Sequence, residues 1–564
     1  MIFAALSGYY ERIARESQEA LPAPGYSVEN VSFAVVIDAN GNLVRIEDLR
    51  VGGGRKPKPR RMVVPQPPKK SVNIAPSFLW GSAAYVFGAD TKVSKKKDRQ
   101  VKCRDRHREL VEGATEGCND MDAQAVLSFL TEWVPGASGE LEMWEEIAQG
   151  NLVFRIDGKT GFVHENPAMK EAWEAYRGGR NEERTSGRCL VTGERTCIAR
   201  LHPSIKGVRG AQSSGASIVS FNKDSFCSYG GDGKQGLNAP VGERVTFAYT
   251  TALNWLLKKQ TVAVADTTVV FWAERKTPME SFFGFALNPA KDEAPTEEVR
   301  AYLQAARQGR SPHDPSDDTR FFVLGLAPNA SRLSIRFWYD GTTGEIGERL
   351  GRHFADIAVE KQRKEKDPDF PPVWRLLLET AAQHESKNIP PLLGGAMLRS
   401  ILNGGLYPNN LLSLLIMRMR AGDDVNYFKA SLIKGFLVRN YNQSREDLMS
   451  LDAENKTPAY LLGRLFAILE KAQKDAVPGA NATIKDRYYG SASATPRSVF
   501  PILLRTAQHH IAKAEYGRFT DAQIEKVVQD LSEFPAHLNL EQQGLFAMGY
   551  YHQRNANYNK KDAD

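Results

Sequence analysis

The stretch Lys361-Gln-Arg-Lys-Glu-Lys-Asp-Pro-Asp-Phe-Pro-Pro372 separates two parts of the sequence that differ in their apolar patterns. It combines charged residues with three prolines, which is typical of a boundary segment. Before it, β-rich runs alternate with helical spacing, whereas beyond Val373 β-rich runs nearly vanish. The sequence therefore predicts an α+β multidomain protein, with a mixed α/β region over residues 1–366 and an all-α helical bundle over residues 367–564.

Apolar residues in the C-terminal part recur at helical spacing. The clearest amphipathic helices are expected at Leu461–Leu469, Ile502–Ile511 and Ile524–Leu531. These patterns are the main evidence for the predicted bundle.

Two β signals stand out in the N-terminal part. Apolar runs on both sides of Asn40-Gly41 predict a hairpin over residues 33–46, because positive φ costs little at Asn-Gly. A second strand, Arg332–Trp338, places Leu333, Ile335 and Phe337 on one face by its period of two. Its other face, with two arginines and Trp338, would either bind nucleic acid or pack against a helix.

Positive charge is concentrated between Arg55 and Arg108. The whole chain has 74 basic and 67 acidic residues, a net charge of +7, and this stretch alone holds 16 basic residues against 3 acidic ones. Prolines recur along residues 55–70, which forbids a helix and predicts a basic, proline-rich arm or a long surface loop. Such a local excess attracts nucleic-acid phosphates, although a solvated loop without a ligand is the alternative interpretation.

Several classes of protein are excluded or disfavoured. No apolar run approaches the roughly 20 residues that a membrane span needs. Residues 1–20 carry Glu11, Arg12, Arg15, Glu16 and Glu19, so no apolar stretch of signal-peptide type forms there, and the five cysteines include no C-x-x-C pair. We therefore expect a cytoplasmic protein without disulfides.

No catalytic residue, cofactor or metal site is predicted. Cys189, Cys197, His202 and Cys227 lack the paired spacing of structural zinc ligands. The segment Gly231–Gly236 matches G-x-G-x-x-G, but Asn238-Ala-Pro240 follows in place of a helix. We expect a chain that is not an enzyme; the alternative is a metal-dependent nuclease with an unrecognised carboxylate site.

Polar segments rich in Gly, Ser and Asn carry a family resemblance. They read Gly8-Tyr-Tyr-Glu-Arg12, Lys69-Lys-Ser-Val-Asn-Ile-Ala-Pro76, Cys189-Leu-Val-Thr-Gly-Glu-Arg195, Leu201-His-Pro-Ser-Ile-Lys-Gly-Val-Arg-Gly-Ala-Gln-Ser-Ser-Gly215, Leu324-Gly-Leu-Ala-Pro-Asn-Ala-Ser-Arg-Leu-Ser-Ile-Arg-Phe-Trp338 and Gly549-Tyr-Tyr-His-Gln-Arg554. Through these segments, from the first residues to the last few, the chain resembles the large subunit of the subtype I-C CRISPR Cascade interference complex.

The resemblance implies a noncatalytic subunit of an RNA-guided surveillance complex in antiviral defence. Base pairing with a guide RNA would read the target, while this subunit would recognise the flanking motif (PAM) in double-stranded DNA and help to open the duplex into an R-loop. The implied partners are guide RNA, double-stranded target DNA, the Cascade backbone and small subunits, and a separate helicase-nuclease that cuts.

Three groups of residues are candidates for nucleic-acid binding. Lys69 and Lys70 are expected to contact phosphates and Asn73 a base edge of the flanking motif, unless Asn73 caps a helix starting near Pro76. A second group, expected to govern the salt dependence of binding, comprises Lys95, Lys96 and Lys97.

The third group lies in the Gly-rich stretch Lys206–Asn222. Lys206 and Arg209 supply charge, and Gln212, Ser213 and Ser214 are candidates to contact the opening duplex. The alternative is a loop that only packs against a neighbouring strand.

The C-terminal part has a possible second product. Relatives of the resembled family yield a C-terminal fragment from an internal start, and Met449 precedes the long helix expected at Leu461–Leu469. A start there would give a small subunit of 116 residues, 449–564, which is long enough for a bundle of about four helices. An ordinary terminal domain without a second product is the alternative.

Overall fold

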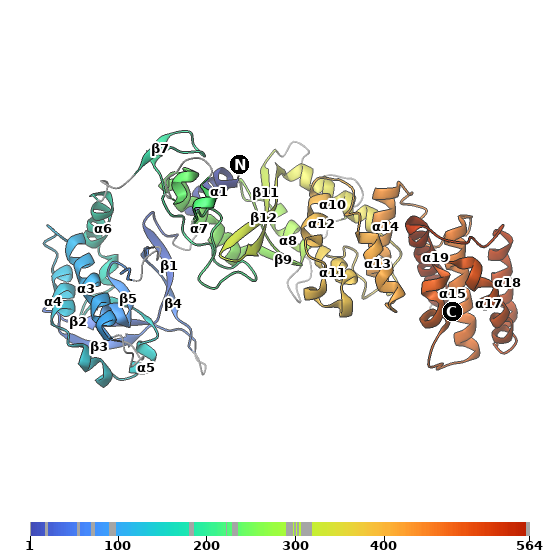
Figure 1. Ribbon diagram of the computed structural model, residues 1–564, viewed down its shortest axis with the longest axis horizontal. Helices are drawn as coiled ribbons and strands as arrows, with labels where there is room; N and C mark the ends of the chain where they lie inside the picture. Colours follow the sequence, from blue (N-terminus) through green and yellow to red (C-terminus); the bar gives the residue numbers. More distant parts are fainter. Residues whose placement is uncertain are drawn as a thin grey trace. The chain divides into compact units, whose positions relative to one another are not determined.

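The computed structural model describes residues 2–16, 21–52, 57–68, 74–89, 97–179, 185–221, 223–227, 235–288 and 318–559, with residues 297, 301, 304 and 305 (Figure 1). The chain divides into two compact units. The first unit comprises residues 1–205 and 219–253, and the second comprises residues 206–218 and 254–564. Both units contain helices and strands, which confirms the α+β multidomain fold class.

The first unit is built on a four-stranded sheet. Its strands lie in the order β3 (Leu43–Asp48), β2 (Phe33–Ile37), β6 (Asn151–Ile156) and β5 (Trp80–Ser82). The predicted hairpin is confirmed, since β2 and β3 pair antiparallel and Gly41 has φ +90° between them. In contrast, β2 pairs with β6 in parallel.

Helices cover one face of this sheet. They are α2 (Ala83–Val86), α3 (Lys97–Ala114), α4 (Met121–Glu132), α5 (Trp144–Ile147) and α6 (Pro167–Gly179). Phe33, Val35 and Ile37 of β2 share one apolar core with buried residues of these helices. The Asp120 side chain caps α4 by accepting hydrogen bonds from the N–H groups of Asp122 and Ala123.

A two-stranded antiparallel ribbon packs on the other face of the sheet. It consists of β1 (Tyr26–Val31) and β4 (Arg60–Pro65). Met62 and Val64 of β4 are buried in one cluster with Ala34 and Val153 of the sheet. The basic, proline-rich segment is therefore not an arm or a loop throughout, because residues 60–65 form a paired strand that ends at a proline.

Smaller elements complete the first unit. They are α1 (Ile2–Glu16), the paired strands β7 (Ser186–Arg188) and β8 (Arg195–Cys197), and α7 (Glu243–Lys259), whose last residues belong to the second unit.

The second unit contains an antiparallel sheet. Its order is β12 (Arg332–Thr342), β11 (Arg320–Asn329), β10 (Thr267–Ala273) and β9 (Thr261–Val264), and its core includes residues of α8 (Met279–Leu287) and α10 (Thr343–Ile357). A bulge interrupts the β11–β12 pairing at Gly325/Leu326. As a result, Phe337 is buried whereas Ile335 is 41% exposed, so the expectation that they share a face is wrong.

Trp338 of β12 has a packing role. Trp338 stacks on Phe322 with ring centroids 5.6 Å apart, and it lies 5.7 Å from Trp272. Trp272 is fully buried. The contacts therefore favour packing over an open aromatic platform, although the partners are strands and not the helix expected from the sequence.

Every element assigned to the described residues beyond Val373 is helical. The α-helices are α11 (Val373–Leu377), α12 (Leu393–Leu402), α13 (Leu411–Arg420), α14 (Tyr427–Tyr441), α15 (Pro458–Ala476), α16 (Ile484–Ala492), α17 (Pro496–Ile511), α18 (Gly517–Gln529) and α19 (Leu540–Asn559). The three helices expected from apolar spacing correspond to α15, α17 and α18. One apolar core runs from β9 to α19.

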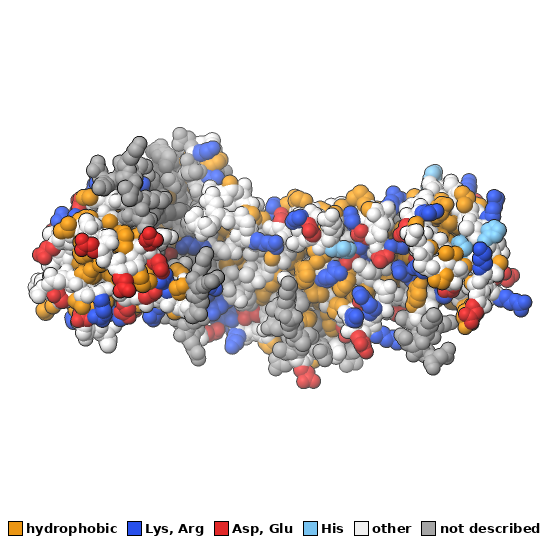
Figure 2. All heavy atoms as spheres, turned by 90° about the horizontal axis from the view of Figure 1, so that it is seen from below, with side chains coloured by type: hydrophobic (Ala, Val, Ile, Leu, Met, Phe, Trp, Pro, Cys, Tyr) orange, Lys and Arg blue, Asp and Glu red, His pale blue; other side chains and the backbone are white. Residues whose placement is uncertain are grey.

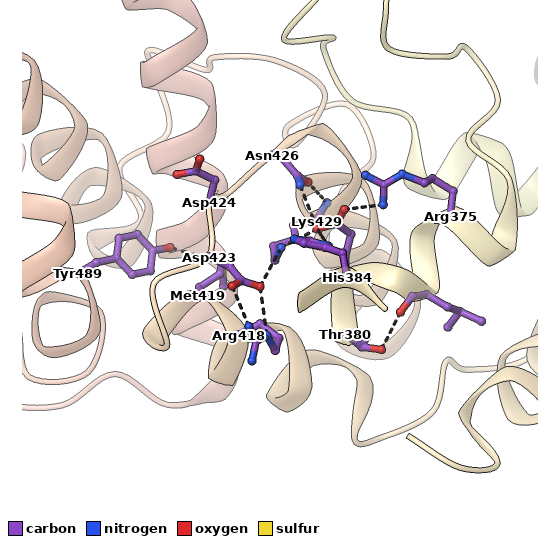
Figure 3. A network of polar contacts seen from close by, with 12 residues as sticks. Arg375, Thr380, His384, Arg418, Met419, Asp423, Asp424, Asn426, Lys429 and Tyr489 are labelled. Atoms are coloured by element: carbon purple, nitrogen blue, oxygen red, sulfur yellow. Dashed lines mark hydrogen bonds and ion pairs between the residues drawn. The ribbon is translucent and has the colours of Figure 1, made fainter. Parts of the chain in front are cut away.

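Helix α14 is buried almost all round and carries buried cations. Lys429 Nζ lies 2.5 Å from a carboxylate oxygen of Glu379 and 3.5 Å from one of Asp423. Figure 3 shows Asp423 directed toward Arg418 and Lys429, and Asp424 directed away from them. Asp424 instead pairs with Lys485 of α16.

Candidate nucleic-acid interface

The β1–β4 ribbon presents basic side chains in the first unit. Lys58, Arg60 and Arg61 are exposed at the end of the ribbon where β4 begins. None of the three forms an ion pair with a carboxylate among the described residues. Because a two-stranded β-ribbon fits the major groove of DNA, this arrangement is suited to nucleic-acid binding.

The opposite end of the ribbon is held by side chains of other elements. Trp80 Nε1 donates a hydrogen bond to the carbonyl oxygen of Pro65 at 2.8 Å, and Trp173 Nε1 donates one to Gly25 at 3.3 Å. The His164 ring nitrogen Nε2 lies 3.2 Å from the carbonyl oxygen of Val63. Burial lowers the pKa of His164 to about 4, so the ring is neutral near pH 7. The basic end therefore extends from a fixed base.

The first two groups of predicted binding residues fall largely outside the described residues. This applies to Lys69, Lys70, Asn73, Lys95 and Lys96, and Lys97 begins α3 without a described side chain. The alternative role of Asn73 as a helix cap is wrong, because residues 74–79 contain no helix and the next helix begins at Ala83.

Some of the basic residues between Arg55 and Arg108 form hydrogen bonds or ion pairs with other residues of the first unit. Arg104 donates a hydrogen bond to the carbonyl oxygen of Trp133 at 2.6 Å, and Arg106 pairs with Glu109 at 2.8 Å. On the face seen in Figure 2, Lys and Arg side chains are interspersed with Asp and Glu. Local geometry therefore decides where positive charge is available to a ligand.

The third predicted group lies on an exposed loop of the second unit. Lys206, Arg209, Gln212, Ser213 and Ser214 are all exposed. Between them, Gly207 and Gly210 have φ values of +97° and +78°, a conformation that favours glycine. The structure thus brings the five side chains onto one short loop and leaves them accessible.

Both ends of this loop are anchored. The N–H of Lys206 donates to Asn254 Oδ1 at 2.8 Å, and the N–H of Arg209 donates to Thr268 Oγ1 at 3.2 Å. At the other end, the N–H of Ser217 donates to the carbonyl oxygen of Ser331 at 3.1 Å. The loop therefore packs against β10 and β12 at its ends, as the alternative interpretation expects, and exposes its centre.

Two further cations lie beside the loop. Lys258 and Lys259 are exposed at the C-terminal end of α7, and a Cβ added at Gly207 would lie 3.5 Å from Leu257 Cβ. Neither lysine stands out in the sequence. Their signal is a pair of basic residues at the end of a helix, which by itself also fits a favourable interaction with the helix dipole.

The candidate zinc ligands do not gather. His202 Nδ1 lies 2.6 Å from the hydroxyl of Tyr249, and Cys189 Sγ accepts a hydrogen bond from the N–H of Gly242 at 3.3 Å. Within the described part of the chain, no group of three or more His, Cys, Asp or Glu side chains could hold a metal ion.

No helix among the described residues is long and apolar enough to cross a membrane.

Comparison with known proteins identifies a family. A protein-family model described as CRISPR-associated protein (Cas_Csd1) matches residues 6–558. No curated protein matches the chain. The family match spans both compact units.

Proposed function

Because the chain belongs to the CRISPR-associated Cas_Csd1 family, we propose that it is the noncatalytic large subunit of a subtype I-C Cascade complex. In this proposal, guide RNA reads the target and this chain reads the PAM in double-stranded DNA. The chain also helps to form the R-loop and recruits a separate helicase-nuclease. It assembles with the Cascade backbone and small subunits.

The family match over nearly the whole chain carries the proposal, and the β1–β4 ribbon supports it. The ribbon has a fixed base and three exposed cations, and the segment with Lys69, Lys70 and Asn73 follows β4 directly. Phosphate contacts from the ribbon would set the register on DNA, and an amide side chain in the next segment would discriminate bases.

The anchored loop from Lys206 to Gly215 supports the second part of the proposal. Its ends are fixed by hydrogen bonds, whereas Gln212, Ser213 and Ser214 are exposed. Polar side chains on a fixed loop can contact bases that leave the duplex, and the nearby lysines attract the phosphates. Replacing all three with alanine should impair strand opening more than initial binding. Permanganate footprinting of the displaced strand measures strand opening.

The decisive experiment measures binding to duplexes that differ only in the flank. A library with a randomised flank first identifies the preferred sequence. Asn73→Ala should then cost about 1 to 3 kcal/mol on the preferred flank and much less on a wrong one. Equal losses on both flanks would contradict base recognition by Asn73.

Charge variants provide the comparison. The double variant Arg60→Gln with Arg61→Gln should weaken binding on both flanks and lower the slope of log K against log salt by about 0.9 for every phosphate that is no longer bound. Lys95, Lys96 and Lys97 changed to Glu should also flatten the slope. The matched control is Lys364→Gln with Lys366→Gln, two exposed lysines that should leave the slope unchanged.

A nuclease assay tests the remaining alternative. Purified chain is incubated with labelled DNA and RNA in the presence of Mg²⁺ or Mn²⁺. The proposal expects no cleavage, and metal-dependent cleavage by the chain alone would contradict its noncatalytic role.

A further inference from the structure

The loop between α12 and α13, residues 403–410, is an exposed segment with a rigid centre. Its sequence is Asn403-Gly-Gly-Leu-Tyr-Pro-Asn-Asn410. Leu406 is 62% exposed, whereas the adjacent Tyr407 is only 1% exposed. The three asparagines are exposed as well. The loop thus combines a buried anchor with an accessible apolar and amide surface.

Two side chains, His353 and Asn440, fix the Tyr407 anchor. Its hydroxyl oxygen lies 2.5 Å from His353 Nδ1. The Asn440 amide binds the Tyr407 backbone on both sides, accepting from its N–H at 3.1 Å and donating to its carbonyl oxygen at 3.0 Å. Side chains beside Tyr407 are therefore presented on an ordered backbone, which reduces the entropic cost of binding a ligand.

Arginines converge on the same segment because α12 ends there. The last carbonyl groups of a helix have no partner within the helix, so they attract cations. Arg349 donates to the carbonyl oxygen of Leu402, the last residue of α12, at 2.5 Å. In the loop beyond the helix, Arg352 donates to the carbonyl oxygen of Gly404 at 3.4 Å and Arg439 to that of Gly405 at 3.1 Å. Arg399, in the last turn of α12, is exposed.

The nearby carboxylates leave positive charge in excess. Asp356 is buried and pairs with both Arg439 and Arg445. Glu345 lies 3.9 Å from Arg349, and the other carboxylate on this side of α10 is the exposed Glu348. Among the described residues, Arg352 and Arg399 form no ion pair. Their planar guanidinium groups suit the geometry of phosphate oxygens.

We propose that this loop and its arginines form a second nucleic-acid surface, in which Arg352 and Arg399 bind phosphates and Leu406 contacts sugar or base. The inference rests on the proposed function, since it takes nucleic acid as the ligand of the chain. Exposed amide side chains at positions 403, 409 and 410 favour nucleic acid over an acidic protein, because an amide can both donate to and accept from base edges.

The test uses the full chain and two probes, a DNA duplex and a single-stranded RNA, titrated by fluorescence anisotropy at several salt concentrations. Arg352→Gln with Arg399→Gln should lower the slope of log K against log salt by about 1.8 for duplex or about 1.4 for a single strand. The variant Arg352→Lys with Arg399→Lys should retain most of the slope. Lys364→Gln with Lys366→Gln is the matched control of equal charge change, and a thermal melt establishes that each variant is folded.

The outcomes separate this inference from the proposed function. A lower slope with only one of the probes supports the surface and identifies which nucleic acid it binds. Binding by every variant with unchanged slopes on both probes overturns the inference alone. Unchanged slopes together with failure to assemble with other subunits would identify a protein-binding surface, and this result would also overturn the inference of a nucleic-acid surface. Failure of the unmodified chain to bind either probe would contradict the proposed function itself.

Discussion

At the scale of single residues, the buried ion pair of Lys429 and Glu379 is the most sensitive contact. Both side chains have no exposed surface, and Glu379 is also bound by Arg375 at 2.8 Å and by Asn426 at 2.9 Å. Lys429→Met should lower the free energy of unfolding by about 3 to 5 kcal/mol, because it leaves a buried carboxylate with one cation fewer. Urea denaturation measures this change.

The control for this prediction is an exposed ion pair. Lys387 has a side chain that is 75% exposed and lies 2.7 Å from Glu385. Lys387→Met should cost less than about 1 kcal/mol, since solvent screens the pair. Similar losses in the two variants would contradict the role assigned to the buried pair.

Buried histidines give the protein a defined response to acid. Burial lowers the pKa of His107 to about 4 and that of His552 to about 3, whereas an unfolded histidine titrates near 6.5. Between these values the unfolded chain binds protons that the folded chain does not, so stability falls as the pH falls. The loss should begin near pH 6.5 and reach on the order of 3 kcal/mol for each histidine near pH 4.

Urea unfolding at pH 7.5 and at pH 5.0 checks this prediction. The unfolding midpoint should be lower at pH 5.0, and calorimetry should record proton uptake on unfolding. An identical midpoint at the two pH values would contradict the neutral state of these rings.

At the scale of elements, the α15–α19 pair depends on two glycines. A Cβ added at Gly463 would lie 2.0 Å from the carbonyl oxygen of Phe546, and one at Gly549 would lie 2.1 Å from that of Tyr460. The two backbones are therefore in direct contact. Gly463→Ala should destabilise the protein by about 1 to 3 kcal/mol or more, because the helices must separate.

Gly8→Ala in α1 is the matched comparison for thermal melts. A Cβ at Gly8 meets nothing within 4 Å, so the same substitution should stabilise its helix by about 0.5 to 1 kcal/mol. The two substitutions should change the melting temperature in opposite directions. A neutral Gly463→Ala would show that the helices can move apart without cost.

Elements with local signals could be predicted from the sequence, and those that depend on distant partners could not. Asn40-Gly41 predicted the β2–β3 turn, and apolar spacing predicted α15. Strand β4 was missed because its prolines and arginines indicate an extended arm, whereas pairing with β1 and burial of Met62 determine its structure. The bulge in β12 left no sequence signal that an alternating pattern could detect.

In the candidate interface, too, features with local sequence signals could be predicted and those that depend on distant residues could not. Exposure of Gln212 could be expected from a Gly-rich loop, but the loop is fixed at its first end by Asn254 and Thr268 and at its other end by Ser331, all far along the chain. The contribution of Lys258 could not be foreseen, because only the folded chain brings the end of α7 beside Gly207. For the segment from Lys69 to Asn73, the sequence remains the basis of the prediction.

At the scale of the whole molecule, Met449 lies at a suitable boundary for a second product. It precedes α15 in a loop, and residues 449–559 contain the five helices α15–α19. Several contacts that join this segment to preceding helices are polar, such as Asp424 with Lys485 and Arg420 with Gln543 at 2.8 Å. A separate copy would expose these polar groups to water at little cost, whereas the apolar side chains that α13 and α14 share with α19 in one core would need a new partner surface.

Expression of the gene with the Met449 codon changed to Leu tests this idea. The unmodified gene should yield a co-purifying band of about 13 kDa, in proportion to the 62.7 kDa of the whole chain, and the changed codon should remove it. The full-length product should be unaffected. Persistence of the band, or its absence from the unmodified preparation, would contradict a start at Met449.

The parallel pairing of β2 with β6 has a consequence for synthesis on the ribosome. Phe33 pairs with Leu152 and Ile37 with Ile156. Strand β2 therefore cannot form this pairing until β6, more than one hundred residues later in the chain, has been translated. At typical elongation rates of 5–20 residues per second, that delay is roughly 6 to 23 s. During this delay, one edge of the apolar strand Phe33–Ile37 has unpaired backbone N–H and carbonyl groups, which can pair with other nascent chains. Slow translation of this region would therefore lower the yield of native protein, and a chaperone that shields the edge would restore it.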